Sequence, residues 1–319
     1  MRKIEYIIGL LAALSLTAAC ECAEFDIDIP TTPKLVLLCC PGPADTTILQ
    51  LYKTIPVGNT YSGYPFLEDA KVDFKVNGAP LEMTYAAEQV GSVPEGCWFV
   101  PRGFNAGDKV EVSAAADGAG SISASTVLPP EPPIYEYQFA IDEAGRKQLR
   151  MTFTDDSEDE DWYGVAVECE RTKVQDGATT VEYSLLKPKT ENTGLNGVTL
   201  DQNYVDVGFN GWTFGAWWYA VRVWPDSAFG QKEIALNVTL IESAFSWEGD
   251  FEYSMRYRVR LYRFTREFFR YVTAVDNVAN NNFAAGGIAP MPLSFTNVNG
   301  GAGALAGWTM RETDWITNE

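Results

Sequence analysis

The side chains of this chain that could do chemistry are carboxylates, arginines, tryptophans and cysteines, because its 319 residues include no histidine. Without an imidazole, the chain cannot form a Ser-His-Asp or Cys-His catalytic pair, an imidazole-ligated zinc site or the usual general base near neutral pH. Two carboxylates could still act together, as they do in glycosidases. The 43 acidic residues form no motif that singles out such a pair. We therefore expect a protein that binds or assembles, that is not an enzyme and that needs no cofactor.

A cysteine near the N-terminus is the candidate for covalent modification. After a basic start, residues 6–19 form an apolar run as long as a signal-peptide core and shorter than the ~20 residues that span a bilayer. The run ends in Thr17-Ala18-Ala19-Cys20, which resembles a bacterial lipobox. We expect residues 1–19 to be a lipoprotein signal peptide and Cys20 to carry the lipid anchor. Cleavage by an ordinary signal peptidase near Ala19 is the alternative.

Residues 20–33 form an acidic segment directly after this cysteine, with carboxylates at Glu21, Glu24, Asp26 and Asp28. Acidic residues in this place resemble the export signal that sends lipoproteins of Bacteroidota-type bacteria to the outer face of the outer membrane. A solvated acidic tether that needs no receptor is the alternative. We favour the export signal, which implies that the protein is exposed on the cell surface.

The densest run of carboxylates lies between two expected strands. Six of the seven residues 155–161 are acidic, and hard cations such as calcium prefer several oxygen ligands. The spacing departs from the D-x-D-x-D-G pattern of a calcium loop, because Ser157 stands at its third position and no glycine follows before Gly164. We favour a solvated turn without metal, with a calcium site as the alternative.

Aromatic side chains are concentrated in the second half of the chain. Four of the nine tryptophans lie within thirteen residues, in the group Trp212, Phe214, Trp217, Trp218, Tyr219 and Trp224. The two-residue period of a strand places Trp218, Arg222 and Trp224 on one face. We favour packing of this face on another element, and a stacking platform for a sugar or a protein is the alternative. These three residues are candidate contact residues.

A row of arginines stands out in a chain of net charge −19. Arg256, Arg258 and Arg260 alternate along an expected strand, and six arginines occur within residues 256–270. Such a row could dock carboxylates or anionic sugars, so these three are also candidate contact residues. We favour pairing with carboxylates on a neighbouring strand. The acidic residues considered for this pairing are Glu248, Asp250 and Glu252.

The remaining cysteines do not indicate a function. Cys22, Cys39, Cys40, Cys97 and Cys169 show no metal-type spacing. Cys39 or Cys40 could pair with Cys97 in an oxidising compartment, and buried free thiols on strands explain these cysteines equally well.

A glycine-rich segment near the C-terminus resembles a phosphate-binding loop only superficially. Residues 300–307 lack the lysine and the hydroxyl of a P-loop. We expect close backbone packing or a bulged strand there.

The elements that must position these residues are mostly strands. Short apolar stretches about ten residues apart, separated by Asn-Gly, Asp-Gly and proline signals, predict an immunoglobulin-like β-sandwich over residues 34–128. The expected strands are 34–40, 46–54, 70–76, 81–85, 97–100, 109–116 and 121–127. Four prolines within residues 129–133 predict an extended linker and a domain boundary.

Residues 134–319 are expected to form a second β-rich, sandwich-like domain with one helix. Its expected strands are 134–141, 148–154, 163–171, 179–186, 217–224, 234–241 and 254–264. The helix begins after Thr265 as N-cap, carries an apolar stripe that includes Phe268 and Val272, and ends at Asn280. The predicted fold class is therefore all-β, with two sandwich-like domains and one C-terminal helix.

Phrases of the second half resemble a known family. Residues 153–163 (FTDDSEDEDWY) are similar to the F-x-D-P-x-G-x-x-x-Y-Y stretch of the Bacteroidota lipoprotein family catalogued as domain of unknown function 4249. Residues 226–230, the strand and helix over 257–271, and residues 294–303 (SFTNVNGGAG) follow in that family's order. The Asp-Pro-x-Gly turn of the family is replaced here by the acidic run.

The resemblance implies a surface-exposed, lipid-anchored outer-membrane protein without catalytic residues, often found beside TonB-dependent transporters. We expect such a transporter as partner, with a glycan or peptide as ligand, and an adhesive or pilus-associated structural lipoprotein is the alternative. Nucleic acid is not an expected partner, because the net charge of −19 and the pI near 4.4 repel its backbone.

Overall fold

A computed structural model describes residues 32–54, 67–141, 143, 147–155, 157–186, 198–199, 222–228, 233–239, 252–279 and 295–317. These residues form a mainly β protein with one α-helix near the C-terminus, as the sequence predicts. No helix in the described ranges is long and apolar enough to cross a membrane.

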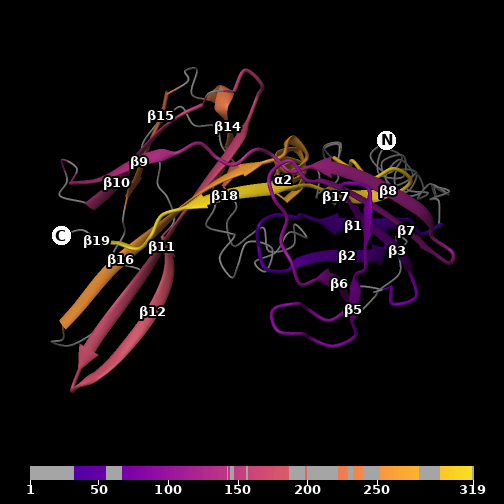
Figure 1. Ribbon diagram of the computed structural model, residues 1–319, viewed down its shortest axis with the longest axis horizontal. Helices are drawn as coiled ribbons and strands as arrows, with labels where there is room; N and C mark the ends of the chain where they lie inside the picture. The colour runs from indigo at the N-terminus through magenta and orange to yellow at the C-terminus, as the bar shows by residue number, and fades with distance from the viewer. Residues whose placement is uncertain are drawn as a thin grey trace, which may run out of the picture.

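Two sheets packed face to face form the N-terminal sandwich (Figure 1). The first sheet has the order β17-β1-β2-β6-β5 and the second the order β4-β3-β7-β8. Their strands are β1 (Leu35–Cys39), β2 (Thr47–Lys53), β3 (Lys71–Val76), β4 (Ala79–Leu81), β5 (Thr84–Ala86), β6 (Cys97–Val100), β7 (Lys109–Ala116), β8 (Gly120–Val127) and β17 (Ala302–Leu305).

The core of this sandwich lies between its two sheets. Leu37 and Leu51 of the first sheet meet Phe74, Val112 and Ile122 of the second. The burial of β8 alternates strictly along residues 121–127, so one face of this edge strand enters the core and the other meets solvent.

The C-terminal part of the chain returns to complete this sandwich. β17 pairs in parallel with β1, with Leu37 opposite Gly303. The backbone of Asn299 also forms two hydrogen bonds with Ser123 of β8. Residues 299–305 therefore lie along the edges of both sheets.

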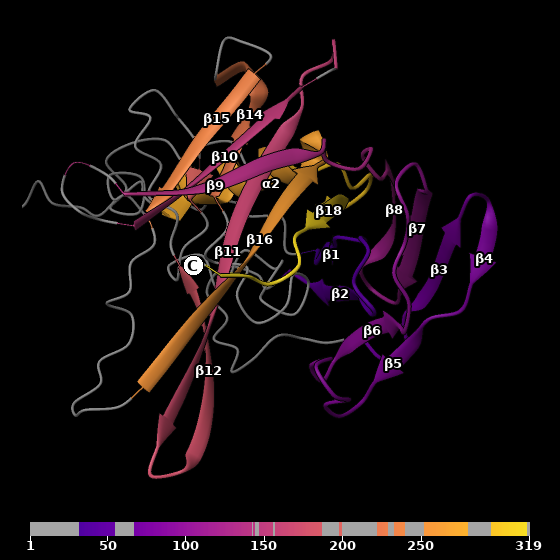
Figure 2. The same cartoon turned by 60° about the vertical axis from the view of Figure 1, so that its left-hand side comes forward.

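Two further sheets form the C-terminal part of the molecule (Figure 2). A three-stranded sheet has the order β15-β10-β9, and a seven-stranded sheet has the path β13-β14-β11-β16-β18, with β12 beside β11 and β19 beside β16. Their strands are β9 (Tyr135–Ile141), β10 (Lys147–Thr154), β11 (Trp162–Gln175), β12 (Ala178–Leu186), β13 (Val198–Thr199), β14 (Arg222–Pro225), β15 (Glu233–Thr239), β16 (Glu252–Phe264), β18 (Trp308–Glu312) and β19 (Ile316–Thr317).

A second core fills the space between these two sheets. It joins Met151 and Phe153 of β10 to Tyr163 of β11, Trp224 of β14 and Val259 of β16. The opposite face of the seven-stranded sheet carries apolar residues where the start of β11 pairs with the end of β16. Farther from this point, the same face carries charged residues on both strands.

The single described α-helix, α2 (Arg266–Ala279), lies between the two halves of the molecule. Its Phe268 and Val272 share one core with Leu38 of β1 and with Tyr262 and Trp308 of the seven-stranded sheet. The predicted N-cap is confirmed, because the Thr265 hydroxyl accepts a hydrogen bond from the Phe268 N–H at 3.4 Å.

The proline-rich segment lies along β18 and is held there by side chains. Thr309 donates its hydroxyl to the Pro130 carbonyl at 2.7 Å, and Arg311 donates to the Pro132 carbonyl at 3.0 Å and to Glu131 at 2.8 Å. These bonds fix the segment that the sequence predicts as an extended linker.

A long three-stranded arm extends from the C-terminal half in both views (Figures 1 and 2). We define the arm as residues 167–186 of the β11–β12 hairpin together with residues 252–257 of β16. The hairpin turns at Asp176 and Gly177, which both have positive φ (51° and 79°), as a two-residue hairpin turn requires.

Candidate functional site

The arginine row predicted from the sequence lies on β16 at the base of the arm. β16 pairs with β11 so that Arg256 is opposite Glu170 and Arg258 is opposite Glu168. The Arg256 guanidinium donates two hydrogen bonds of 2.6 Å to the two oxygens of Glu170. Arg258 donates to one oxygen of Glu168 at 2.6 and 3.1 Å. Both are charge-assisted bonds in register with the sheet.

The third arginine connects this row to β18. The Arg260 guanidinium lies 3.1 Å from Glu168 and 3.1 Å from Glu312. Cross-strand pairing of the arginines is thus confirmed, although the partners are Glu168, Glu170 and Glu312. Glu252, one of the partners considered from the sequence, lies on β16 itself, and residues 248 and 250 are outside the described ranges. Glu252 was therefore a wrong partner, whereas pairing with Glu248 or Asp250 is untested; the observed pairs with β11 and β18 join residues more than fifty positions apart.

A tryptophan that the sequence analysis did not single out completes the row. The ring of Trp315 lies under two guanidiniums, with centroid distances of 4.8 Å to Arg256 and 4.7 Å to Arg258. Tyr183 of β12 lies 6.3 Å from the same ring. Such stacking orders the arginine side chains and adds a cation–π contribution. We call Arg256, Arg258, Arg260, Glu168, Glu170, Glu312, Trp315, Tyr183 and Val181 the arginine face.

The ion pair between Arg256 and Glu170 stabilises the charged forms of both side chains. The hydrogen bonds from Arg256, helped by the Tyr183 hydroxyl, lower the pKa of the Glu170 carboxyl against the opposing effect of its burial. The same pair raises the pKa of Arg256. A buried carboxylate without its arginine would be costly, so each glutamate and its arginine depend on each other.

The aromatic candidates on β14 have a different role. Trp224 is completely buried among Tyr163 and other residues of the second core, so it cannot form the contact surface considered from the sequence. Its neighbour Val223 is buried in the core around α2, so both faces of β14 are covered. Arg222 lies on β14 opposite Val165, and Trp218 lies outside the described residues.

The acidic run forms the turn between β10 and β11, as predicted, but two of its carboxylates are buried instead of solvated. Asp155 accepts hydrogen bonds from the Ser157 N–H at 3.1 Å and the Tyr163 hydroxyl at 3.2 Å. Asp161 accepts hydrogen bonds from the Nε of Arg263 at 3.0 Å and from one terminal guanidinium nitrogen of the same side chain. Within the described ranges, no three acidic or cysteine side chains are placed to hold a metal ion together.

The cysteines of the described ranges are buried thiols. Cys39, Cys40, Cys97 and Cys169 form no disulfide, which agrees with the thiol alternative of the sequence analysis. Burial raises the pKa of Cys97 to about 11, so this thiol is neutral and unreactive at pH 7. Cys20, Cys22 and the acidic segment lie outside the described residues, and Cys20 lipidation stays a prediction.

The glycine-rich segment serves close backbone packing, as expected. A Cβ on Gly303, whose φ is +95°, would lie 2.0 Å from the Leu37 carbonyl oxygen. A Cβ on Gly301 would lie 2.4 Å from the Leu35 carbonyl oxygen. The side chain of Asn297 fixes this segment by two hydrogen bonds, of 2.7 and 3.0 Å, to the backbone of Leu305.

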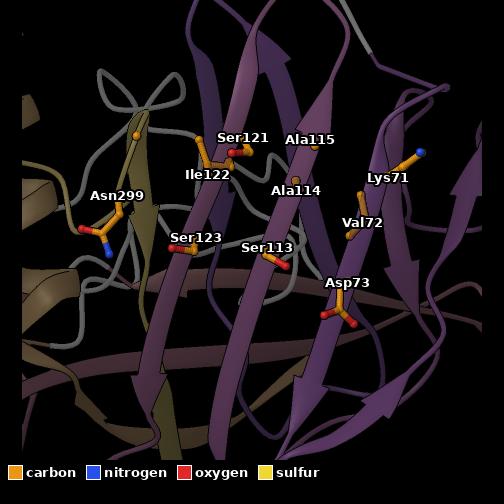
Figure 3. A pocket seen from close by; sticks show the side chains of 11 residues that line it. Lys71, Val72, Asp73, Ser113, Ala114, Ala115, Ser121, Ile122, Ser123 and Asn299 are labelled. Carbon is orange, nitrogen blue, oxygen red and sulfur yellow. The ribbon is translucent and has the colours of Figure 1, made fainter.

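A shallow trough with both polar and apolar lining residues on the outer face of the N-terminal sandwich was not predicted (Figure 3). Its volume is about 840 Å³. Ser113, Ser121 and Ser123 form its floor, Lys71 and Asp73 of β3 flank it on one side, and the segment of Asn299 on the other. The only sequence signal is the alternation of serines along β8. Its described lining includes no aromatic ring for stacking a sugar.

Comparisons with known proteins identify a family and nothing closer. No curated protein matches the chain. Two solved structures, both described as a cytokine receptor complex, align at 10% identity. One (crystal form 2) has a TM-score of 0.21 and covers 71% of this chain and 89% of its own, and the other (crystal form 1A) has 0.22, 88% and 96%. These scores carry no structural argument.

The family comparison agrees with the resemblance seen in the sequence. A family model described as Domain of unknown function (DUF4249) matches residues 23–314, which include the N-terminal sandwich, the helix, all strands of the C-terminal sheets except β19, and the arginine face except Trp315. With nearly the whole chain matched, this protein belongs to the DUF4249 family.

Proposed function

We propose that this protein is a lipid-anchored binding protein on the outer face of an outer membrane, where it acts as a non-enzymatic accessory partner of a TonB-dependent transporter. Cys20 carries the lipid, residues 20–33 serve as the tether, and the folded part makes the contact. The proposal combines the lipobox-like Thr17-Ala18-Ala19-Cys20 with the acidic residues that follow it.

One observation supports a binding role above all others: the arm exposes apolar and aromatic side chains on the face that is turned away from the second core. Val181 and Tyr183 of β12 are 45% and 50% exposed, and Val174 of β11 is 43% exposed. All three lie on the face that carries Arg256 and Trp315. A contiguous apolar patch next to ordered arginines is typical of a protein interaction surface.

A test of the anchor compares two neighbouring cysteines. Cys20→Ala is expected to abolish acylation, measured by mass spectrometry of the mature N-terminal peptide, and to release the protein from the membrane fraction. Cys22→Ala is the matched control and is expected to leave both unchanged. Unacylated wild-type protein in the cytosol would refute the proposal.

A test of the transporter partnership uses the wild-type protein extracted in detergent from its native membrane. Affinity purification is expected to recover a transporter β-barrel in near-stoichiometric amount, and protease added to intact cells is expected to cleave the exposed protein. Repeated recovery of this protein alone would exclude the transporter part of the proposal. The binding role of the arm would then be tested separately.

A further inference from the structure

Around Arg256 and Arg258, the arginine face presents its two signs of charge at different depths. At Arg260 the order is reversed, because the side chain of Glu312 is 40% exposed and that of Arg260 is 17% exposed. The side chain of Arg256 is 44% exposed, whereas that of its partner Glu170 is 6% exposed. Arg258 and Glu168 show the same order, with 25% and 10%. The guanidinium groups therefore reach solvent above carboxylates that lie beneath them. An approaching molecule meets cations at this end of the face.

Apolar side chains lie directly beside these arginines on the same face of the sheet. Glu170 pairs across the sheet with Tyr183, and Thr172 pairs with Val181, so both exposed side chains of β12 lie on the side of Arg256. Trp315 joins them, since its ring contacts both Arg256 and Tyr183. Tryptophan, tyrosine and arginine are the residues that dominate binding energy in protein interfaces.

The total charge of the arginine face restricts what can bind there. Its arginines, Arg256, Arg258 and Arg260, are balanced by Glu168, Glu170 and Glu312. A neutral cluster within a chain of net charge −19 does not attract a distant polyanion such as a membrane or a sulfated glycan. It favours a ligand that comes into direct contact and places individual carboxylates opposite the outer guanidinium groups.

We propose that the arginine face is the docking surface for a segment of a partner protein that presents carboxylates beside apolar side chains. The inference rests on the proposed binding function and adds the chemistry of the partner. The face begins beside the core around α2, which ends where Ala166 is opposite Arg260, and continues from there along the arm.

The test places opposite charges at one exposed position that takes no part in the ion pairs. Val181→Glu is expected to weaken binding of a carboxylate-bearing segment on the order of fivefold, and Val181→Lys is expected to keep or strengthen it. Thr180→Glu and Thr180→Lys are the matched controls, because Thr180 is exposed on the opposite face of the same strand. Neither control is expected to change binding. Circular dichroism spectra and urea unfolding midpoints are to be measured for all four variants, to check that each is folded.

The probe is a random copolymer of glutamate and tyrosine, measured by biolayer interferometry with the mature full-length protein in detergent at about 0.15 M salt. The proposal predicts binding that separates Val181→Glu from Val181→Lys and exceeds the binding of polyglutamate. Absence of binding, or equal binding by the two variants, would overturn it. Tighter binding of heparin or phosphatidylglycerol vesicles than of the copolymer, with the same difference between Val181→Glu and Val181→Lys, would assign the arginine face to a polyanion. That result would also overturn the proposal.

This outcome is separable from that of the proposed function. Loss of acylation or of the transporter in native membranes would remove the cellular role and leave the copolymer result unchanged. A transporter that co-purifies equally with Val181→Glu and Val181→Lys would keep the proposed function and remove the arginine face from it.

Discussion

Carboxylates in this chain differ in what neutralises them. Glu168, Glu170 and Asp161 each face an arginine of β16. Asp226 instead faces another carboxyl, that of Asp155, and the burial of Asp226 together with this hydrogen bond raises its pKa to about 6. Two carboxyl groups in hydrogen-bond contact require a proton between them. This pair joins the turn of residues 155–161 to the end of β14.

The carboxyl pair predicts a pH-dependent stability. The folded pKa of Asp226 lies above its unfolded value, so this contribution is complete at low pH and is lost as pH rises through about 6. Because Asp226 is only half-buried, we expect a loss of about 1 kcal/mol in the free energy of unfolding between pH 5 and pH 7. Urea unfolding at the two pH values measures it.

The variant that checks this assignment is Asp226→Asn, whose amide can donate to Asp155 at any pH. It is expected to remove the loss between pH 5 and pH 7. The other charged groups nearby are Glu160, which accepts from Ser227, and the Asp161–Arg263 pair. Asp117→Asn, in the exposed turn after β7, is the control. An equal pH dependence in wild type and Asp226→Asn would contradict the assignment.

Which carboxylate meets which cation could not be predicted from the sequence. The alternation of Arg256, Arg258 and Arg260 placed them correctly on one face, because the two-residue period is local. Their partners depend on the register between β11 and β16, which lie about ninety residues apart in the chain. Trp315 lies in a polar tail without periodicity, so nothing local indicated that two arginines stack on it.

The same distinction holds for whole elements. Strands with alternating or continuous apolar residues were predicted nearly to the residue, as for β6 (Cys97–Val100) and β7 (Lys109–Ala116). The expected strand 81–85 is divided in the structure between β4 and β5. The C-terminal strands β18 and β19 were missed, and β17 was anticipated only as one of two alternatives, a bulged strand within residues 300–307. β17 exists because β1 offers a parallel edge and because glycine at position 303 allows the close approach.

Helix α2 was predicted correctly because its start signal and apolar stripe are both local. The structure adds that Thr265 has two partners. Its hydroxyl accepts hydrogen bonds from the Phe268 N–H at 3.4 Å and from the Gly307 N–H at 3.1 Å. One side chain thus caps the helix and joins it to the turn before β18.

Removal of this hydroxyl is expected to destabilise the protein. Thr265→Ala loses the cap and leaves the buried Gly307 N–H without its acceptor, so we expect a loss of about 2 kcal/mol in the free energy of unfolding. Thr265→Ser keeps the hydroxyl and is expected to retain most of the stability. Urea denaturation followed by circular dichroism compares the two. Equal stability of Thr265→Ala and wild type would show that water replaces both bonds.

At the scale of the molecule, the sequence predicts two sandwiches joined by a proline-rich linker, and the structure connects them further. The linker carbonyls are bonded to β18, β17 belongs to the first sandwich, and α2 contributes to a core shared by both halves. None of these contacts has a local signal, because each joins segments far apart in the chain. They imply that the N-terminal sandwich and the arm move as one body.

A shared core predicts that the two halves unfold together. Phe268 is completely buried, stacks on Phe264 at 4.3 Å and belongs to the core that includes Leu38 of the first sandwich. Phe268→Ala is expected to lower the free energy of unfolding by about 3–5 kcal/mol. Tyr137→Ala, which removes a 42% exposed ring from β9, is the control and is expected to cost far less. Hydrogen exchange should then show faster opening of both β1 and β16 in Phe268→Ala. If β1 kept its wild-type protection while β16 lost it, the N-terminal sandwich would be an independent folding unit, and the arm would be free to turn relative to that sandwich.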